Sequence, residues 1–362
     1  MKQVVAAAAF VALAAPPAAA QLGPLPELRV TDAEEQQIGS SVSSKIRIRF
    51  GVVQDRAIHI YVSSVGLLLA RESSRPRLPW RFIVLDTDGV NAFAAPGGYV
   101  HITRGALALI RNEAELAAVL AHEITHVTEK HTIAAITRGR SLGLAAQRAT
   151  GDRKTILSAL SSRAFEMVID NSYDPEDERA SDEDGIALAA QVGYAPGALA
   201  DFLGRLAERN RNQNERNGLF ASHAETKERI RAARDSASRH GAGALVQGRY
   251  TAAVKYEAKG ISEIAQAPED GTPTAASSAS AAWPKQKSEG KTEEAPAKKG
   301  FSLEALKQRV GAERQTAQVA ASGGARGVGP DRNAYGGPTP DIVAVTISAA
   351  ELEEFRRGIG QG

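Results

Sequence analysis

The 362-residue sequence contains no cysteine. Disulfide bonds are therefore excluded, and a transition metal would have to be bound by histidine and carboxylate side chains. The 44 lysine and arginine residues nearly balance the 42 aspartate and glutamate residues, so the formal net charge is only +2. That balance gives no electrostatic basis for binding nucleic acid or an anionic membrane surface.

Long apolar runs are also missing after residue 21, where none approaches the ~20 residues that cross a bilayer. The start of the chain is different. Lys2 precedes an apolar stretch from Val4 to Ala15, and small residues at 18–20 form a cleavage site. This pattern predicts a secretory signal peptide, the alternative being an apolar helix of the fold. No cysteine follows the cleavage site, so we expect a periplasmic protein without a bacterial lipid anchor, soluble or peripherally attached.

The composition divides the rest of the chain. Residues 21–262 have the pattern of a folded domain, whereas 263–300 form a polar, Pro- and Ala-rich stretch that we expect to be a disordered linker. The tail, 301–362, has no assigned role: it could fold back on the domain, bind a partner in the envelope, or stay a flexible extension. No internal repeat is evident.

Capping residues and apolar spacing predict the main elements. Ser348 and Glu351 form a further capping-box pair near the end of the chain. A hairpin is predicted over 90–103 around Pro96-Gly97-Gly98. Helices are predicted over 31–44, 56–71, 132–172 and 302–317. Further helices are predicted to begin at the Asn112 cap, to run from Asp174 to Gly193, and to continue from there to about residue 240. A strand is predicted at 81–86.

The helix that follows Asn112 carries the stretch AHEITH. His122 and His126 are four residues apart and therefore share one face of a helix, where both can point at one ion. Glu123 lies next to the first of them and could reach a water on the metal. Three fixed letters in five also occur by chance, so the motif alone does not decide between a zinc site and a coincidence.

Zinc held by two imidazoles needs a third protein ligand and an open position for water. His131 lies too close in sequence to fold back comfortably, so a carboxylate is expected. The acidic run EDERASDEDG offers Glu178 and Asp182, which are four apart on a predicted helix. Glu178 could bind zinc while Asp182 accepts the spare ring N–H of a histidine. Spacing does not select Glu178 over its acidic neighbours, and a solvated acidic helix start is the alternative.

Several ordered motifs carry a family resemblance: VNAFAAPGGYVHITRGAL, NEAELAAVLAHEITHVTEKH, and ERASD before GYAP. Over about residues 28–240 the chain resembles the zinc metallopeptidases related to CAAX prenyl endopeptidases and HtpX, and most of all their soluble periplasmic BepA-like branch. The resemblance implies an α+β, mainly helical, zincin-like domain over 21–262, with a small sheet beside the HEXXH helix.

Carried over by position, the resemblance implies one Zn²⁺ per chain on His122, His126 and Glu178. It makes Glu123 the general base and places Asp182 behind a ligand, within the catalytic site.

The resemblance also implies a substrate strand at Asn91-Ala92-Phe93-Ala94, beside the active-site cleft. An exposed edge there could hold an extended substrate as an added strand, although the segment could equally be a plain hairpin strand. The segment LFASHAETKERI has alanine where relatives have proline. It suggests His223 as a displaceable fourth zinc ligand, or His223 or Arg229 as an oxyanion stabiliser; an exposed histidine is the alternative.

The BepA-like branch continues into tetratricopeptide repeats, and this chain shows nothing of that period after residue 240. We expect a zinc metalloendopeptidase of the bacterial cell envelope that hydrolyses misfolded or unassembled exported proteins through a zinc-activated water. The alternative is a non-catalytic periplasmic chaperone or binding protein that keeps the fold.

Overall fold

The computed structural model describes residues 29–138, 152–170, 173–211, 223–260 and 340–361. The expected signal peptide 1–20, the linker 263–300 and the helix expected at 302–317 lie outside these ranges. Within them, no helix has the length and apolar character needed to span a membrane.

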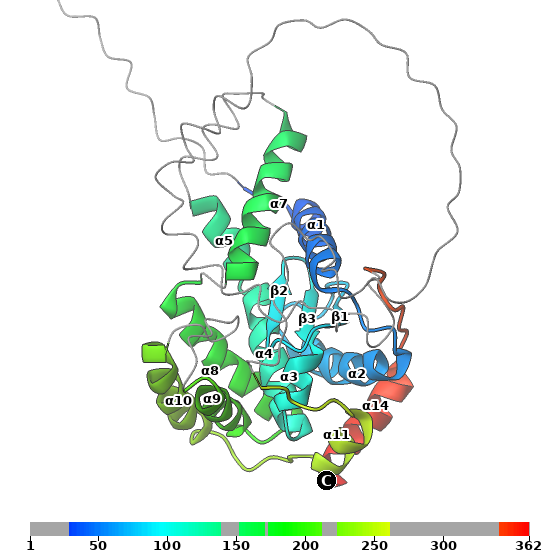
Figure 1. Ribbon diagram of the computed structural model, residues 1–362, viewed down its shortest axis with the longest axis vertical. Helices are drawn as coiled ribbons and strands as arrows, with labels where there is room; N and C mark the ends of the chain where they lie inside the picture. The colour runs from blue at the N-terminus through cyan, green and yellow to red at the C-terminus, as the bar shows by residue number, and fades with distance from the viewer. Residues whose placement is uncertain (1–28, 139–151, 171–172, 212–222, 261–339, 362) are drawn as a thin grey trace, which may run out of the picture.

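The described part is mainly helical, with one small sheet at its centre (Figure 1). This confirms the fold class expected from the sequence. Its elements are α1 (Asp32–Phe50), α2 (Arg56–Glu72), β1 (Arg81–Leu85), β2 (Ala92–Ala95), β3 (Tyr99–Thr103), α3 (Arg104–Leu109), α4 (Glu113–Thr128), α5 (His131–Arg138), α7 (Arg153–Asp170), α8 (Pro175–Val192), α9 (Ala198–Arg209), α10 (His223–Ala237), α11 (Gln247–Ala253), α14 (Ala349–Arg357) and the 3₁₀ turn η6 (Ile359–Gln361).

Helix boundaries follow local capping chemistry. Thr31 and Ser348 each form a reciprocal capping box, Asp174 accepts from the backbone of Glu176, and Gly193 ends α8 at φ 112°. The predicted starts and the predicted stop at Gly193 are therefore confirmed. The helical region expected over 132–172 contains α5 and α7, and its residues 139–151 and 171–172 are not described.

The sheet has the strand order β1-β3-β2. The hairpin expected over 90–103 is present, with β2 antiparallel to β3 and a turn in which Gly97 and Gly98 adopt positive φ. β1 runs parallel to β3, a pairing that the sequence pattern did not reveal.

Apolar side chains cover both faces of this sheet. Phe82 and Val84 of β1 join a cluster with α2 and α4. Ile83 and Leu85 alternate with them and join a second cluster with α1, α5 and α7. Because both faces are buried, the strand reads as a continuous apolar run rather than an alternating one.

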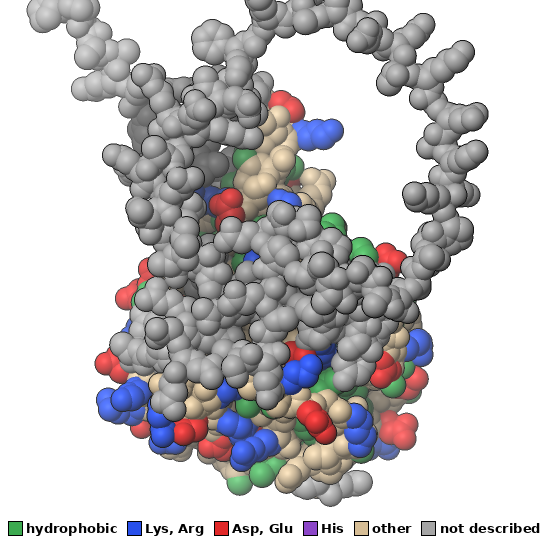
Figure 2. Space-filling view, viewed as in Figure 1, with side chains coloured by type: hydrophobic (Ala, Val, Ile, Leu, Met, Phe, Trp, Pro, Cys, Tyr) green, Lys and Arg blue, Asp and Glu red, His purple; other side chains and the backbone are tan. Residues whose placement is uncertain are grey.

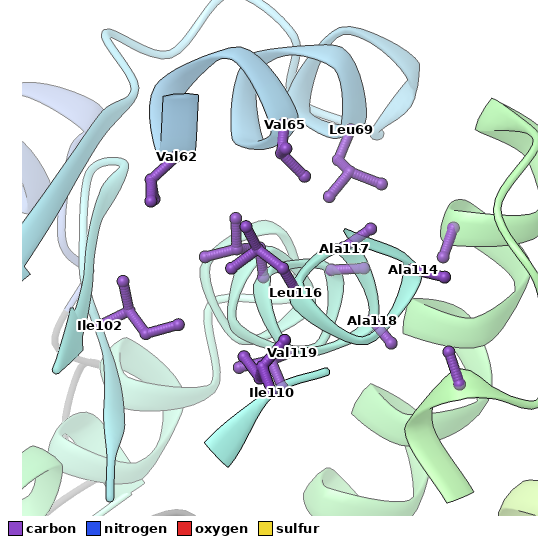
Figure 3. Packing of buried hydrophobic residues seen from close by; sticks show 14 of the residues in the cluster. Val62, Val65, Leu69, Ile102, Ile110, Ala114, Leu116, Ala117, Ala118 and Val119 are labelled. Carbon is purple, nitrogen blue, oxygen red and sulfur yellow. The ribbon is translucent and has the colours of Figure 1, made fainter. Parts of the chain in front are cut away.

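Helix α4 lies at the centre of the larger cluster, between α2 and α8 (Figures 1 and 3). Every residue from Glu113 to Val127 is buried. Val62 and Val65 project from α2 toward Leu116 of α4 (Figure 3). The sequence suggested one apolar face, but α2, α8, α9 and the sheet surround this helix on all sides.

Helix α8 packs along much of the length of α4. Gly185 permits this close approach, because a Cβ at that position would lie 2.9 Å from the backbone nitrogen of His122. Gly185 follows Glu178 and Asp182 on the same face of α8. The missing side chain therefore sets how near these two carboxylates come to α4.

The C-terminal residues 340–361 return to the domain. Leu352 and Ile359 are 1% and 3% exposed and belong to the larger core. The Arg249 guanidinium lies 3.8 Å from the Phe355 ring centre and also binds Glu113, the first residue of α4. The part of the tail that is described thus packs against the domain, near the start of α4.

On the face shown in Figure 2, acidic and basic side chains are intermixed over the described residues. This matches the near-zero net charge of the sequence.

We predict that Gly185→Ala lowers the free energy of unfolding by about 1–3 kcal/mol, because the added methyl group forces α8 away from α4. The same displacement would move Glu178 and Asp182 away from His122. The matched control is Gly204→Ala in α9, where a Cβ meets nothing within 4 Å. Urea unfolding of both variants checks this prediction, and equal stability of the two would contradict it.

Candidate metal centre

The two histidines of the HEXXH motif are presented by the middle of α4. The Asn112 side chain accepts from the Glu115 backbone N–H and starts the helix there. His122, Glu123 and His126 are 1%, 2% and 3% exposed. The motif therefore lies inside the domain and not on a solvated helix face.

Glu178 of α8 completes a cluster with the two rings. The Nε2 atoms of His122 and His126 are 3.1 Å apart. Glu178 Oε2 lies 3.7 Å from His122 Nε2, and Glu178 Oε1 lies 3.4 Å from His126 Nε2. Within the described ranges, this is the one group of three or more metal-binding side chains whose ligand atoms all lie within 4.8 Å of one another.

The ionisation of His126 and Glu178 fits a bound cation. Burial lowers the pKa of His126 to about 4, so the ring is neutral at pH 7 and its nitrogen can bind a metal. Burial raises the pKa of Glu178, but the two histidines and Arg229 outweigh that effect and lower it to about 2. Two imidazoles and one carboxylate, with no sulfur, form a set typical of catalytic zinc.

Asp182 lies behind the first histidine, on the side away from the cluster. Its Oδ1 is 2.9 Å from His122 Nδ1, so His122 directs Nε2 at the ion position. Arg229 of α10 donates hydrogen bonds to the Asp182 carboxylate from Nε and Nη2, both at 2.8 Å. Its Nη1 lies 2.9 Å from Glu178 Oε2. Arg229 thus joins the ligand carboxylate to the supporting one.

Glu123 is the unusual member of the site. Its Oε1 is buried and has no hydrogen-bond partner among the described residues. Burial raises the pKa of Glu123 to about 8. A buried carboxyl oxygen without a partner is costly, and such groups often mark a functional site. Its position beside His122 suits contact with a water at the ion.

The comparisons with known proteins identify the domain. The pattern of peptidase family M48 matches residues 59–237, a range that includes α4, α8 and Arg229. This chain carries a peptidase family M48 domain.

Several curated proteins are similar to this chain. The beta-barrel assembly-enhancing protease of Escherichia coli strain K12 is 28% identical over 217 residues, covering 57% of this chain and 44% of that protein. A Vibrio cholerae serotype O1 protein provisionally given the same name is 29% identical over 252 residues, covering 63% and 51%. A mitochondrial metalloendopeptidase of Schizosaccharomyces pombe is 30% identical over 174 residues, covering 48% and 51%. The chain spans about half the length of these curated relatives.

The M48 domain also contains site residues that sequence reasoning missed. His131 contacts His126 directly, with their Nδ1 atoms 3.0 Å apart, although the sequence suggested that it could not fold back. Tyr173 stacks on His126 with ring centres 4.1 Å apart. A third histidine after HEXXH was a visible signal, but the turn that brings it back was not.

The suggested substrate strand is placed differently from the expectation. β2 is the outer strand in the hydrogen-bond order, but Asn91, Ala92, Phe93 and Ala94 are only 8%, 0%, 2% and 3% exposed. These residues are buried rather than exposed, because α4 and α7 contact β2, and their role in binding substrate stays a prediction.

Two further expectations concern α10. His223 is its first residue, but the His223 side chain lies outside the described part, so a fourth-ligand role stays a prediction. Arg229 binds both carboxylates of the M48 site. Those contacts fit a role in holding Glu178 and Asp182 better than a role in stabilising an oxyanion.

We predict that Asp182→Asn weakens zinc binding by about 10–100-fold, because the amide cannot satisfy both His122 and the Arg229 guanidinium. The matched control is Asp184→Asn, an exposed position on the same helix. Competition with a chromophoric chelator measures both dissociation constants. Equal zinc dissociation constants for the two variants would contradict a role of Asp182 in the site.

Proposed function

We propose that this chain is a zinc-dependent metalloendopeptidase of the bacterial cell envelope. One observation carries the proposal. An M48 domain places a buried glutamate, Glu123, whose Oε1 has no hydrogen-bond partner among the described residues, beside a cluster of two histidines and a carboxylate. A module that only binds protein has no use for that costly glutamate.

His122, His126 and Glu178 would hold the ion. When bound, Zn²⁺ supplies Lewis acidity, which polarises a carbonyl group and makes a nearby water a stronger acid. Asp182 and Arg229 keep His122 and Glu178 in place during the reaction. Three protein ligands are the number typical of catalytic zinc sites, in which water or substrate takes the fourth position.

Glu123 performs the proton transfers. The positive charge of a bound Zn²⁺ would lower the pKa of Glu123 and leave it ionised. Its carboxylate would then accept a proton from the water that attacks the peptide carbonyl and deliver that proton to the leaving amine. Glu123 is buried, so bulk water is kept away from its carboxylate. The attacking water then does not compete with bulk water for this base.

An extended polypeptide would bind along β2. β2 is the outer strand in the hydrogen-bond order, so its free edge would pair with one more strand. Asn91, Ala92, Phe93 and Ala94 are buried, and α1, α4 and α7 all contact β2, so a substrate would reach this strand only after that packing opened.

The substrate class and the compartment rest on further observations. The first 20 residues have the pattern of a secretory signal peptide, and the absence of cysteine is compatible with an oxidising compartment. Two relatives are named for enhancing beta-barrel assembly. We therefore propose a periplasmic enzyme that acts on misfolded or unassembled exported proteins.

We predict that Glu123→Gln retains zinc at wild-type stoichiometry and loses at least ~10²-fold in the rate of casein cleavage, because the amide cannot accept the proton. Glu166→Gln is the matched control, since Glu166 is exposed on α7. A chelator should abolish cleavage by wild type and control.

The same assay separates an enzyme from a binding protein that keeps the fold. Cleavage by Glu123→Gln at the control rate would refute the proposed role of Glu123. A wild-type protein that binds zinc and unfolded casein but cleaves nothing would instead indicate a chaperone.

A further inference from the structure

The chain reverses sharply between α4 and α5. Lys130 adopts φ 56°, an uncommon conformation for a residue other than glycine. Its ammonium group lies 3.0 Å from Asp32 Oδ1 and 3.2 Å from Glu35 Oε2 on α1, which hold the turn in place. As a result α5 begins at His131, whose ring returns toward the zinc helix and is buried.

Each nitrogen of His131 has a different neighbour. The Nδ1 atom lies 3.0 Å from His126 Nδ1 and 3.4 Å from the Ser181 hydroxyl. The Nε2 atom lies 3.7 Å from Asp177 Oδ1. Both Ser181 and Asp177 belong to α8, the helix that also carries the carboxylates of the metal centre.

These neighbours determine where the protons lie. His126 directs Nε2 into the metal cluster, so its Nδ1 is the spare ring nitrogen and carries a proton when the ring binds an ion. That N–H needs an acceptor. Asp177 attracts a proton to Nε2 of His131, which leaves a lone pair on His131 Nδ1 for the N–H of His126 and the Ser181 hydroxyl.

We propose that His131 is the positioning residue for His126, the second metal-binding histidine. His131 accepts the Nδ1–H of His126, and Asp177 fixes the tautomer of His131. The inference rests on the proposed metal site. Asp182 serves His122 directly, whereas Asp177 serves His126 through one intervening imidazole. One helix, α8, thereby orients both histidines of α4.

Tyr173 limits the remaining freedom of the His126 ring. It stacks on that ring at an interplanar angle of 29°, and its hydroxyl lies 2.8 Å from the Thr132 hydroxyl at the start of α5. Stacking alone would let the ring slide in its plane. The contact with His131 supplies the directional hold that stacking lacks.

Two substitutions at one position test the proposal. In His131→Asn, the side-chain oxygen can occupy the place of the ring Nδ1 and accept the same N–H; in His131→Leu, a side chain of similar bulk has no acceptor. We expect His131→Leu to weaken zinc binding by about 10–100-fold and His131→Asn to retain most of the affinity. Chelator competition gives the dissociation constants, and thermal unfolding of the metal-free proteins verifies that both fold.

A second readout reports the tautomer itself. In zinc-loaded wild type, ¹⁵N NMR of the histidine rings should show His126 protonated at Nδ1 and His131 protonated at Nε2. Equal zinc affinity of wild type and His131→Leu, or equal losses in the Leu and Asn variants, would overturn the inference. Wild-type protein that binds no zinc would instead refute the proposed function, so the two failures are distinguishable.

Discussion

The close packing of α8 on α4 is the constraint on which the site depends. Gly185 leaves no side chain between the two helices at the level of His122. That contact places Glu178 near the Nε2 atoms of both imidazoles and Asp182 near Nδ1 of His122. The buried charges are then balanced locally, because Arg229 pairs with both carboxylates. Helix packing and electrostatics thus act together to form one preorganised centre.

Much of this could be predicted from local sequence signals. The Asn112 and Asp174 caps mark the two helices, and a spacing of four residues puts His122 with His126, and Glu178 with Asp182, on single faces. The Pro-Gly-Gly turn predicts the hairpin because its glycines supply the positive φ angles. Each of these features depends on residues within one turn of each other, which is why a sequence pattern suffices.

The rest depends on contacts between distant segments. The His131 ring returns to His126 because Lys130 adopts a positive φ and binds Asp32 of α1. No local sequence pattern predicts either property. The parallel pairing of β1 with β3 and the burial of β2 beneath α7 are likewise tertiary. Asp177 looked like part of a solvated acidic helix start, and only the fold places it beside His131.

X-ray absorption at the zinc edge of the purified wild-type protein tests the central claim most directly. The account predicts one zinc per chain, with scattering from two imidazole rings and from light oxygen or nitrogen ligands at about 2.0–2.2 Å. A spectrum without imidazole scattering, or a protein that retains no zinc after purification, would contradict the assignment of His122, His126 and Glu178 as its ligands.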